Sequence, residues 1–449
     1  TFLNPQASVL CGVSQREAIG GHLFDVLARV RGTPRGTAEP TAGEIRASGL
    51  VVRDAGGREV RADIERLAEA GADGSGILVV FRGDPGAAAT ASKPTSAAMR
   101  PFGAGTRLAI FSHDTLGLGH LQRCTNIAVA LAARFPGLSV LLLTGSPAVH
   151  RYALPPGIDY VKLPSVRMVG AEKYEARSLG LSDDGMLRLR TNLILRSIQD
   201  YDPHVLLVDH APAGMKGEML PTLEWLGRHR PDCIKMIGLR DVLDEPEAVK
   251  ALWSEQGTYD LLRDSYDHIL VYGSPEIVDP AEAYGFSPEL IAKTRYCNYV
   301  GEVGEEGARA AGSAGSAGAR PLVAVTIGGG DGGGETVIGS YLEMLRLRGA
   351  GVGWDSVILP GPFLPGDLRE RFEREARDLG VRILDFVPST SPYIAQAEVV
   401  VCTGGYNTSA QSLRFGRKVL MIPRMMHRQE QFLRAKRLAE LGLVTMLCP

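Results

Sequence analysis

The chain has 449 residues, of which 45% are hydrophobic and 22% charged, and its formal net charge is -2. Because one domain usually takes roughly 100 to 200 residues, we expect three domains in this chain. The composition excludes a collagen-like or disordered protein, and the near-neutral charge gives no reason to expect nucleic acid as a partner.

Residues 1–84 form the first predicted domain, a small unit of the α+β class. The motifs that indicate its fold are the turn Phe2-Leu3-Asn4-Pro5, the helical positions Gly12, Glu17, Gly20, Leu23 and Phe24, and the strand Ile77–Arg82. In this order they resemble a PAS sensory domain that lacks its first strand. The resemblance implies regulation, or pairing of two chains into a homodimer. We assign this domain no ligand.

Two segments rich in Gly, Ala, Ser and Pro separate the predicted domains. They are residues 85–105 and 305–319. Neither has apolar periodicity, so neither can bury enough surface to offset the entropy of ordering. We expect two flexible linkers, which leave residues 106–304 as a first lobe and residues 320–449 as a second lobe.

In both lobes short apolar runs alternate with longer amphipathic segments. The expected strands of the first lobe are Leu108–Phe111, Val140–Leu143, Tyr160–Leu163, Val205–Val208, Ile234–Leu239 and Ile269–Val271. Those of the second lobe are Leu322–Ile327, Ser356–Leu359, Arg382–Phe386, Val399–Cys402 and Val419–Ile422. This pattern predicts two Rossmann-like lobes of the α/β class, with a ligand cleft at the carboxyl ends of their strands.

The first lobe opens with a strand and a glycine turn that contains Gly117 and Gly119, followed by His120 at a helix start. Glycine lets the amides of a positive helix terminus approach a ligand closely. An imidazole at this point could take a proton from a hydroxyl group. The alternative is a histidine that only caps or packs the helix.

Two further pairs of polar residues follow strands of the first lobe at the same edge. Asp209 and His210 end one strand, and Arg240 and Asp241 follow another. Asp209 or Asp241 could orient His120 as a base. His210 and Arg240 would lie on the acceptor side of the cleft, where the hydroxyl group that gives up its proton would bind. Asp241 could equally be a loop acid paired with Arg240.

The second lobe carries two glycine turns, each between a strand and a helix. The first contains Gly328, Gly329, Gly330, Gly332 and Gly333, and the second contains Gly404 and Gly405 followed by Asn407, Thr408 and Gln411. Bare backbone amides at such turns form nests for anions, so we expect them to bind a diphosphate. A flexible surface loop is the alternative for the first turn.

A polar loop, Met425–Gln431, follows the strand Val419–Ile422. His427, Glu430 and Gln431 in this loop could contact diphosphate and sugar hydroxyls, although many surface helices begin with Glu and Gln. Basic residues also gather nearby, at Arg414, Arg417, Lys418, Arg424, Arg428, Arg434, Lys436 and Arg437. They would form solvated helix faces, or attract a diphosphate or the head groups of a membrane surface.

Taken in order, these motifs over residues 106–449 resemble the MurG-like, family 28 group of GT-B glycosyltransferases. The resemblance implies transfer of a sugar from a nucleotide-diphosphate donor, a UDP-sugar foremost, to an unknown hydroxyl acceptor, with inversion. His120 matches the base or acceptor-binding histidine of that group. Gly328 to Gly334 match its diphosphate cradle, and His427, Glu430 and Gln431 match its donor loop. No carboxylate pair is placed to hold a metal, so we expect no obligatory metal.

The sequence departs from that group in two places. Gln411 stands where the group has an acidic residue on the donor ribose, and the chain ends at Pro449 without the expected C-terminal helix. The segment around Gly117 to Arg123 is also similar to nucleotide-sugar hydrolases, in which the histidine activates water. There are therefore two alternative functions: a nucleotide-sugar hydrolase of the same fold, or an inert scaffold linked to the PAS-like domain.

Six cysteines are spread along the chain without a close pair, at positions 11, 124, 233, 297, 402 and 448. This spacing offers neither a CxxC motif nor half of a zinc site. There is also no run of about twenty apolar residues and no secretory signal. We expect reduced cysteines in a cytoplasmic protein.

Overall fold

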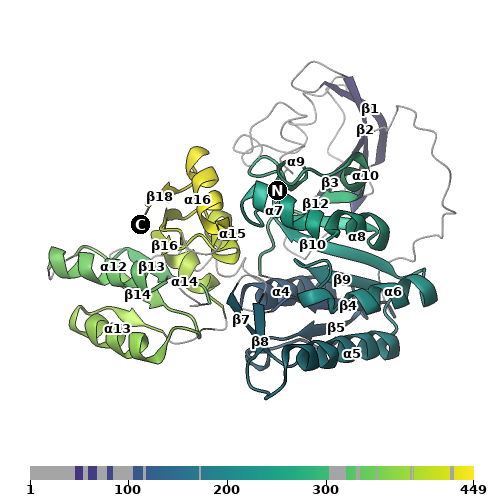
Figure 1. The fold of residues 1–449 in the computed structure, drawn as a ribbon. Coiled ribbons are helices and arrows are strands. Elements are labelled where there is room, and N and C mark those ends of the chain that lie inside the picture. Colours follow the sequence, from purple (N-terminus) through teal and green to yellow (C-terminus); the bar gives the residue numbers. More distant parts are fainter. Residues whose placement is uncertain are drawn as a thin grey trace. The chain divides into compact units, whose positions relative to one another are not determined.

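The computed structural model describes residues 46–53, 59–67, 78–83, 105–114, 118–170, 173–302, 320–329, 334–349, 352–384, 387, 389–424 and 429–448. The chain forms two compact units, Thr1–Ser96 and Ala97–Pro449. The second unit contains both lobes (Figure 1).

The first unit contains a three-stranded antiparallel sheet in the order β1-β2-β3, with β1 (Arg46–Arg53), β2 (Glu59–Leu67) and β3 (Leu78–Gly83). Strand β3 lies where the strand Ile77–Arg82 is expected. The turn and helices that suggested a PAS domain fall in residues 1–45, outside the described residues. The described sheet alone does not show a PAS domain, which stays a prediction.

The first lobe is built on a seven-stranded sheet in the order β12-β11-β10-β9-β4-β5-β6, with all neighbours parallel. Its strands are β4 (Arg107–Ser112), β5 (Ser139–Thr144), β6 (Ile158–Lys162), β9 (Val205–Asp209), β10 (Ile234–Arg240), β11 (His268–Tyr272) and β12 (Thr294–Tyr296). An antiparallel hairpin of β7 (Val166–Gly170) and β8 (Lys173–Ala176) stands beside it. The sequence predicts neither β12 nor this hairpin, because neither is a continuous run of apolar residues.

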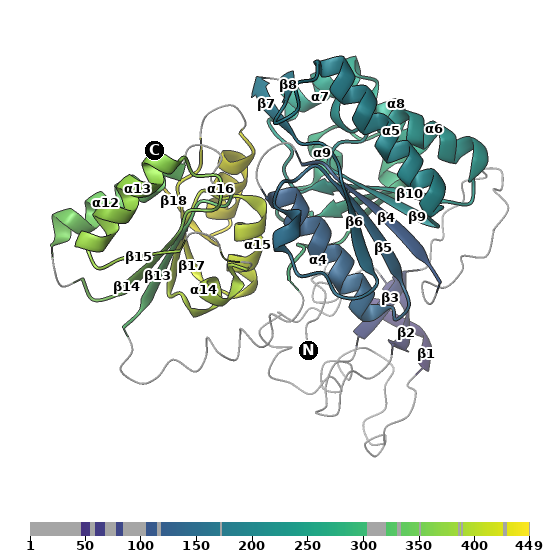
Figure 2. The ribbon, with the colours of Figure 1, turned by 90° about the horizontal axis from the view of Figure 1, so that it is seen from below.

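Both faces of this sheet are covered, so its strands are apolar on both sides. Leu108 and Ile110 of β4 pack with α4 (Gly119–Arg134), whereas Ala109 and Phe111 pack with α5 (Asp183–Tyr201) and α6 (Leu220–His229). Figure 2 shows these helices on opposite sides of the sheet. The remaining helices are η1 (Val149–Arg151), η2 (Met215–Gly217), α7 (Pro246–Glu255), α8 (Thr258–Ser265), α9 (Pro280–Ala283) and α10 (Pro288–Lys293).

The second lobe repeats this design with a six-stranded parallel sheet in the order β15-β14-β13-β16-β17-β18. Its strands are β13 (Leu322–Thr326), β14 (Asp355–Leu359), β15 (Arg382–Ile383), β16 (Val399–Cys402), β17 (Lys418–Met421) and β18 (Thr445–Met446). Its helices are α12 (Gly334–Arg348), α13 (Gly366–Asp378), α14 (Ser391–Gln396), α15 (Tyr406–Arg414) and α16 (Glu430–Glu440). Strand β15 is shorter than expected, and β18 is not predicted.

The two parallel sheets confirm the predicted α/β class with two Rossmann-like lobes. Most of each predicted linker lies outside the described residues, and the exact domain boundaries stay predictions. None of the described helices is both long and apolar enough to cross a membrane.

Candidate functional site

His120 and Asp209 meet at the carboxyl edge of the first sheet. Strand β4 runs beside β9, so the helix α4 that follows β4 begins next to the end of β9. There His120 Nδ1 lies 2.6 Å from Asp209 Oδ2. The Asp209 carboxylate, whose pKa is lowered, can only accept, so we assign Nδ1–H as the donor to it. The other ring nitrogen, Nε2, then carries the lone pair that a base needs.

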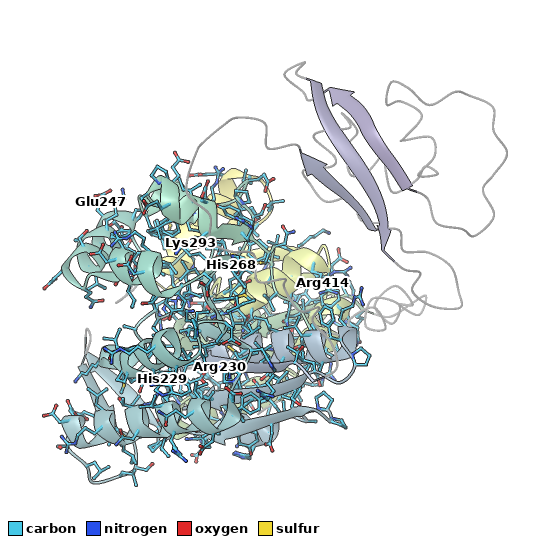
Figure 3. All side chains as sticks on the ribbon, turned by 90° about the vertical axis from the view of Figure 1, so that its right-hand side faces the viewer. His229, Arg230, Glu247, His268, Lys293 and Arg414 are labelled. Atoms are coloured by element: carbon cyan, nitrogen blue, oxygen red, sulfur yellow. The ribbon has the colours of Figure 1, made fainter. Side chains whose placement is uncertain are left out.

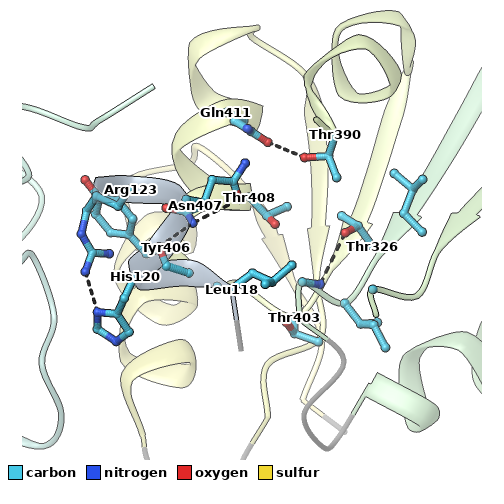
Figure 4. Close-up of a pocket in the computed structure, with 18 of the residues that line it drawn as sticks. Leu118, His120, Arg123, Thr326, Thr390, Thr403, Tyr406, Asn407, Thr408 and Gln411 are labelled. Atoms are coloured by element: carbon cyan, nitrogen blue, oxygen red, sulfur yellow. Dashed lines mark hydrogen bonds between the residues drawn. The ribbon is translucent and has the colours of Figure 1, made fainter. Parts of the chain in front are cut away.

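Arg123 completes this group, although its sequence position alone did not mark it as a site residue. Its Nε donates to Asp209 Oδ1 at 2.9 Å and its Nη2 donates to Oδ2 at 2.7 Å. Nη2 also lies 2.9 Å from His120 Nδ1 (Figure 4). Residues three apart on a helix share a face, so the spacing of His120 and Arg123 could have revealed the pair.

Burial and neighbouring charges set the protonation of this group. Burial lowers the pKa of His120 below the ordinary imidazole value of 6.5, and the charges of Arg123 and Arg240 act in the same direction, against the opposing effect of Asp209. Burial would raise the pKa of Asp209, but Arg123 and the hydrogen bond from His120 outweigh it and lower that pKa. Hence His120 is a neutral imidazole and Asp209 a carboxylate at neutral pH.

Two more histidines stand beside His120. The His210 ring centroid lies 5.0 Å from that of His120, and His113 lies 6.0 Å from it. His210 has a left-handed backbone (φ 70°), and its amide donates to Gly238 O at 2.8 Å. His210 was expected on the acceptor side; His113 was not singled out.

Asp114, directly after His113, is a second buried carboxyl group near the His120–Asp209 pair. Thr144 Oγ1 donates to its Oδ2. Burial raises the pKa of Asp114 to about 6, against the hydrogen bond from Thr144, and the Asp209 charge adds to the rise. Asp114 can therefore change protonation in the mildly acidic range. Asp114 was not predicted as a site residue, because a lone acid after a strand resembles any loop acid.

A glycine bend of the second lobe lies in the same pocket. Gly328 and Gly329 follow β13, Gly328 has a left-handed backbone (φ 72°), and its amide donates to Thr326 Oγ1 at 3.4 Å. Phe363 N donates to Gly329 O at 3.1 Å and ties the loop after β14 to this bend. Gly330, Gly332 and Gly333 lie outside the described residues, as does Gly117 in the first lobe.

Gly361, in the loop after β14, is required by this close approach. Its backbone is left-handed (φ 75°), and an added Cβ would collide with Gly328 O and the Gly329 carbonyl group. We expect Gly361→Ala to destabilise the protein by about 1–2 kcal/mol for the conformation alone, plus the cost of the clash. Gly349, with φ 73° and open space around a Cβ, is the matched control. If urea unfolding gives equal losses for both, the clash is absent.

The second glycine turn leads into α15. Gly404 has φ 79°, Gly405 is the N-cap, and no side chain caps the first turn of the helix. A Cβ added at Gly405 would meet no atom within 4 Å, so the backbone there is open to a ligand. Gly405, Asn407 and Thr408 line the pocket. Uncapped amides at a helix N-terminus favour anions.

Asn407 and Gln411 of α15 have protein partners on either side of the pocket. Asn407 Nδ2 donates to Gly119 O of the first lobe at 3.1 Å. Gln411 Oε1 accepts from Thr390 Oγ1 at 2.8 Å, and its Nε2 lies 3.3 Å from Glu302 Oε1. Glu302, which precedes the segment between the lobes, thus brings a carboxylate to the amide of Gln411.

Asp241 has partners other than His120. Arg434 Nη2 donates to Asp241 Oδ1 at 2.8 Å, with both side chains completely buried, and Tyr299 Oη donates to Oδ2 at 2.9 Å. Asp241 therefore binds a residue of the second lobe, and its hydrogen bonds go to Arg434 and Tyr299 and not to His120. Arg434 is likewise a buried residue and not part of a solvated basic face.

Arg240 and Glu430 form a second ion pair between the lobes, and both line the pocket. Gln431 lines it too, and its Oε1 accepts from Arg424 N at 3.3 Å. Arg240 thus contacts the second lobe, and its place on the acceptor side stays a prediction. His427 lies outside the described residues.

The pocket is lined by both lobes (Figure 4). From the first lobe it includes Gly119, His120, Gln122, Arg123, Tyr152 and Arg240, and from the second Gly328, Gly329, Gly405, Asn407, Thr408, Gln411, Glu430 and Gln431. Among the residues that the structure describes, no group of three or more His, Cys, Asp or Glu is arranged to hold a metal ion.

Fold and site together are those of a two-lobed, GT-B-like protein with a histidine facing glycine turns across a cleft. Residues 366–448 match the model of the glycosyltransferase family 28 C-terminal domain. No curated protein sequence matches the chain.

Solved structures of similar fold include a UDP-glucosyltransferase from Polygonum tinctorium, 14% identical with a TM-score of 0.50, covering 76% of this chain and 84% of that one. The calicheamicin glycosyltransferase CalG4 is 16% identical with a TM-score of 0.47, covering 77% and 86%. MurG of Acinetobacter baumannii is 14% identical with a TM-score of 0.45, covering 76% and 86%. The first of these likenesses supports the GT-B fold of the two lobes.

Proposed function

We propose that the two lobes form a glycosyltransferase that moves a sugar from a nucleotide-diphosphate donor, a UDP-sugar foremost, to a hydroxyl acceptor, with inversion and without an obligatory metal. The observation that carries the proposal is the pocket in which the His120–Asp209 pair of one lobe faces two glycine turns of the other. The match of residues 366–448 to a glycosyltransferase domain supports it.

The base chemistry follows from the protonation of the pair. Neutral His120 takes the proton of the acceptor hydroxyl on Nε2, while its Nδ1–H stays donated to Asp209. The hydroxyl oxygen then forms a bond to the anomeric carbon of the sugar. The imidazolium that results is stabilised by the Asp209 carboxylate, which stays ionised because its pKa is lowered.

The leaving group is the nucleoside diphosphate. As the bond from the anomeric carbon to the phosphate oxygen breaks, its electron pair stays on that oxygen. The uncapped amides of α15 and the bend at Gly328 and Gly329 can donate to the growing negative charge. Glu430 and Gln431, at the start of α16, would face the hydroxyl groups of the sugar.

The proposal is tested by incubating the full chain with radiolabelled UDP-, GDP- and dTDP-sugars and a panel of hydroxyl acceptors. A labelled acceptor is the expected product. Free labelled sugar in place of it would make the protein a hydrolase of the same fold, with water deprotonated by His120. Neither product, together with no nucleotide binding by calorimetry, would overturn the enzyme proposal.

The pH dependence of transfer provides a separate prediction. Protonated His120 cannot accept a proton, so kcat/KM should fall as the pH drops through the pKa of His120. Because that pKa is lowered, the acidic limb should lie below pH 6.5. Asp114, whose pKa is about 6, would titrate in a similar range. The variant Asp114→Asn distinguishes the two groups, because the acidic limb should remain in it if His120 is the group that titrates. A limb above pH 6.5, or one that disappears in Asp114→Asn, contradicts the assignment.

A further inference from the structure

The guanidinium of Arg123 lies close to two aromatic rings that come from different lobes. The Tyr272 ring, from β11 of the first lobe, has its centroid 5.6 Å from Arg123 Cζ. The Tyr406 ring, from the first residue of α15 in the second lobe, has its centroid 5.2 Å away. All three side chains are buried. At such distances a cation is attracted to the face of an aromatic ring.

Tyr406 is itself held in place by the contact between the lobes. Its Oη accepts from Val300 N at 3.1 Å, and Arg434 Cζ lies 5.7 Å from its ring centroid. The Tyr299 ring lies beside it, at 5.6 Å between centroids. Tyr406 also directly follows the turn of Gly404 and Gly405. The ring is therefore fixed to the start of the helix that faces the pocket.

Three direct contacts lead from this ring to the base. Tyr406 packs against Arg123, Arg123 donates two hydrogen bonds to Asp209, and Asp209 accepts the Nδ1 proton of His120. Arg123 has rotatable bonds along its whole side chain, and its orientation depends on what packs against it. The ring of Tyr406, which comes from the other lobe, is the nearer of the two rings to the guanidinium, at 5.2 Å against 5.6 Å for Tyr272.

We propose that Tyr406 is a positioning residue: its ring, supplied by the second lobe, holds Arg123 against Asp209 and so fixes the imidazole of His120. The base is then fully arranged only when the start of α15 is docked on the first lobe. The catalytic meaning of this device rests on the proposed function, whereas the contact itself does not.

The charged and titratable groups around His120 determine how its pKa should change when the Tyr406 ring is removed. They are Asp209 at the end of β9, Arg123 on α4, Arg240 at the end of β10, and the rings of His113 and His210. Asp209 raises the pKa of His120, and Arg123 lowers it. If Arg123 moves away, Asp209 is less neutralised and its effect dominates. The pKa of His120 should then rise by about one unit.

The test is an NMR titration of the full chain with labelled histidine, without any ligand. The His120 resonance is identified by its loss in His120→Ala. Tyr406→Leu removes the ring and should raise the pKa of His120, whereas Tyr406→Phe keeps the ring and should leave it unchanged. If Tyr406→Leu does not fold, Tyr406→Met, which fills the space without a flat face, should give the same rise.

Tyr299→Leu is the matched control. It removes a neighbouring ring from the same contact between the lobes, together with a hydrogen bond to Asp241, but no recorded contact with Arg123. In Tyr299→Leu the pKa of His120 should be the same as in the unchanged protein. An unmoved pKa in both Tyr406→Leu and Tyr406→Met overturns the proposal. So does an equal rise in Tyr299→Leu, because the effect would then belong to docking in general.

An activity measurement keeps this inference separate from the proposed function. Where transfer is observed, the acidic limb of kcat/KM should move up by the same amount in Tyr406→Leu. A structural loss alone would lower kcat and leave the limb in place, which contradicts positioning. Where no sugar transfer is found with any donor, the proposed function fails, but the titration still decides the role of Tyr406.

Discussion

Replacing His120 by alanine is expected to lower the rate of sugar transfer by about 10² to 10⁴-fold, the usual contribution of a general base. The affinity for the nucleoside diphosphate should stay within about twofold, because the glycine turns that would bind it belong to the other lobe. Steady-state kinetics and calorimetry with UDP measure the two quantities. A loss in kcat with unchanged UDP binding would support the assigned base.

The control for this variant is His229→Ala. His229 is an exposed histidine at the end of α6, stacked on Trp225, and Figure 3 shows its position. It has no recorded contact with the His120–Asp209 pair, so both transfer and UDP binding should be unchanged. Full activity in His120→Ala would remove His120 from the mechanism. Equal losses in both variants would indicate a general defect of the first lobe.

Arg434→Met should give the largest loss of stability. It leaves the buried Asp241 carboxylate with Tyr299 Oη and Val242 N as its remaining recorded hydrogen-bond donors. Removing one partner of a buried ion pair costs about 3–5 kcal/mol, because the other charge stays buried without compensation. Urea unfolding should show this as a lower midpoint. A double variant, Asp241→Leu with Arg434→Met, should recover much of the loss.

Arg196→Met is the corresponding surface control. Arg196 and Asp200 form a pair on α5 at 2.8 Å, but their side chains are 72% and 61% exposed. Exposed pairs contribute about 0–1 kcal/mol, so this variant should unfold almost like the unchanged protein. A loss below about 1 kcal/mol in Arg434→Met would show that water reaches the pair and that the lobes part easily.

The fold was largely predictable because its strands are short apolar runs that need no partner to be recognised. The runs at Leu108–Phe111 and Val205–Val208 each became a buried parallel strand. Strand β12, which contains Thr294, Arg295 and Tyr296, is an edge strand with little to bury, and its composition does not distinguish it from a loop.

The site was only partly predictable, because its contacts join distant parts of the chain. His120 and Asp209 could be expected at one edge, since β4 and β9 are both strands of the same sheet. For Asp241 the sequence suggested His120 or Arg240 as the partner, and it could not suggest Arg434, which follows 193 residues later in another lobe. Arg123 was detectable from its helical spacing to His120, but a basic residue inside a helix gives no sign of burial by itself.

The two ion pairs between the lobes have opposite polarity at adjacent positions. In the first lobe Arg240 is a cation and Asp241 is an anion. They pair with Glu430 and Arg434 of α16, respectively. A sliding of the lobes that placed Arg240 beside Arg434 would bring like charges together among buried side chains, which is strongly unfavourable. The charge pattern therefore favours this alignment of the lobes over a shifted one, and salt should do little to weaken it, since buried charges are poorly screened. In descendants of this chain, a change at Glu430 would call for a matching change at Arg240.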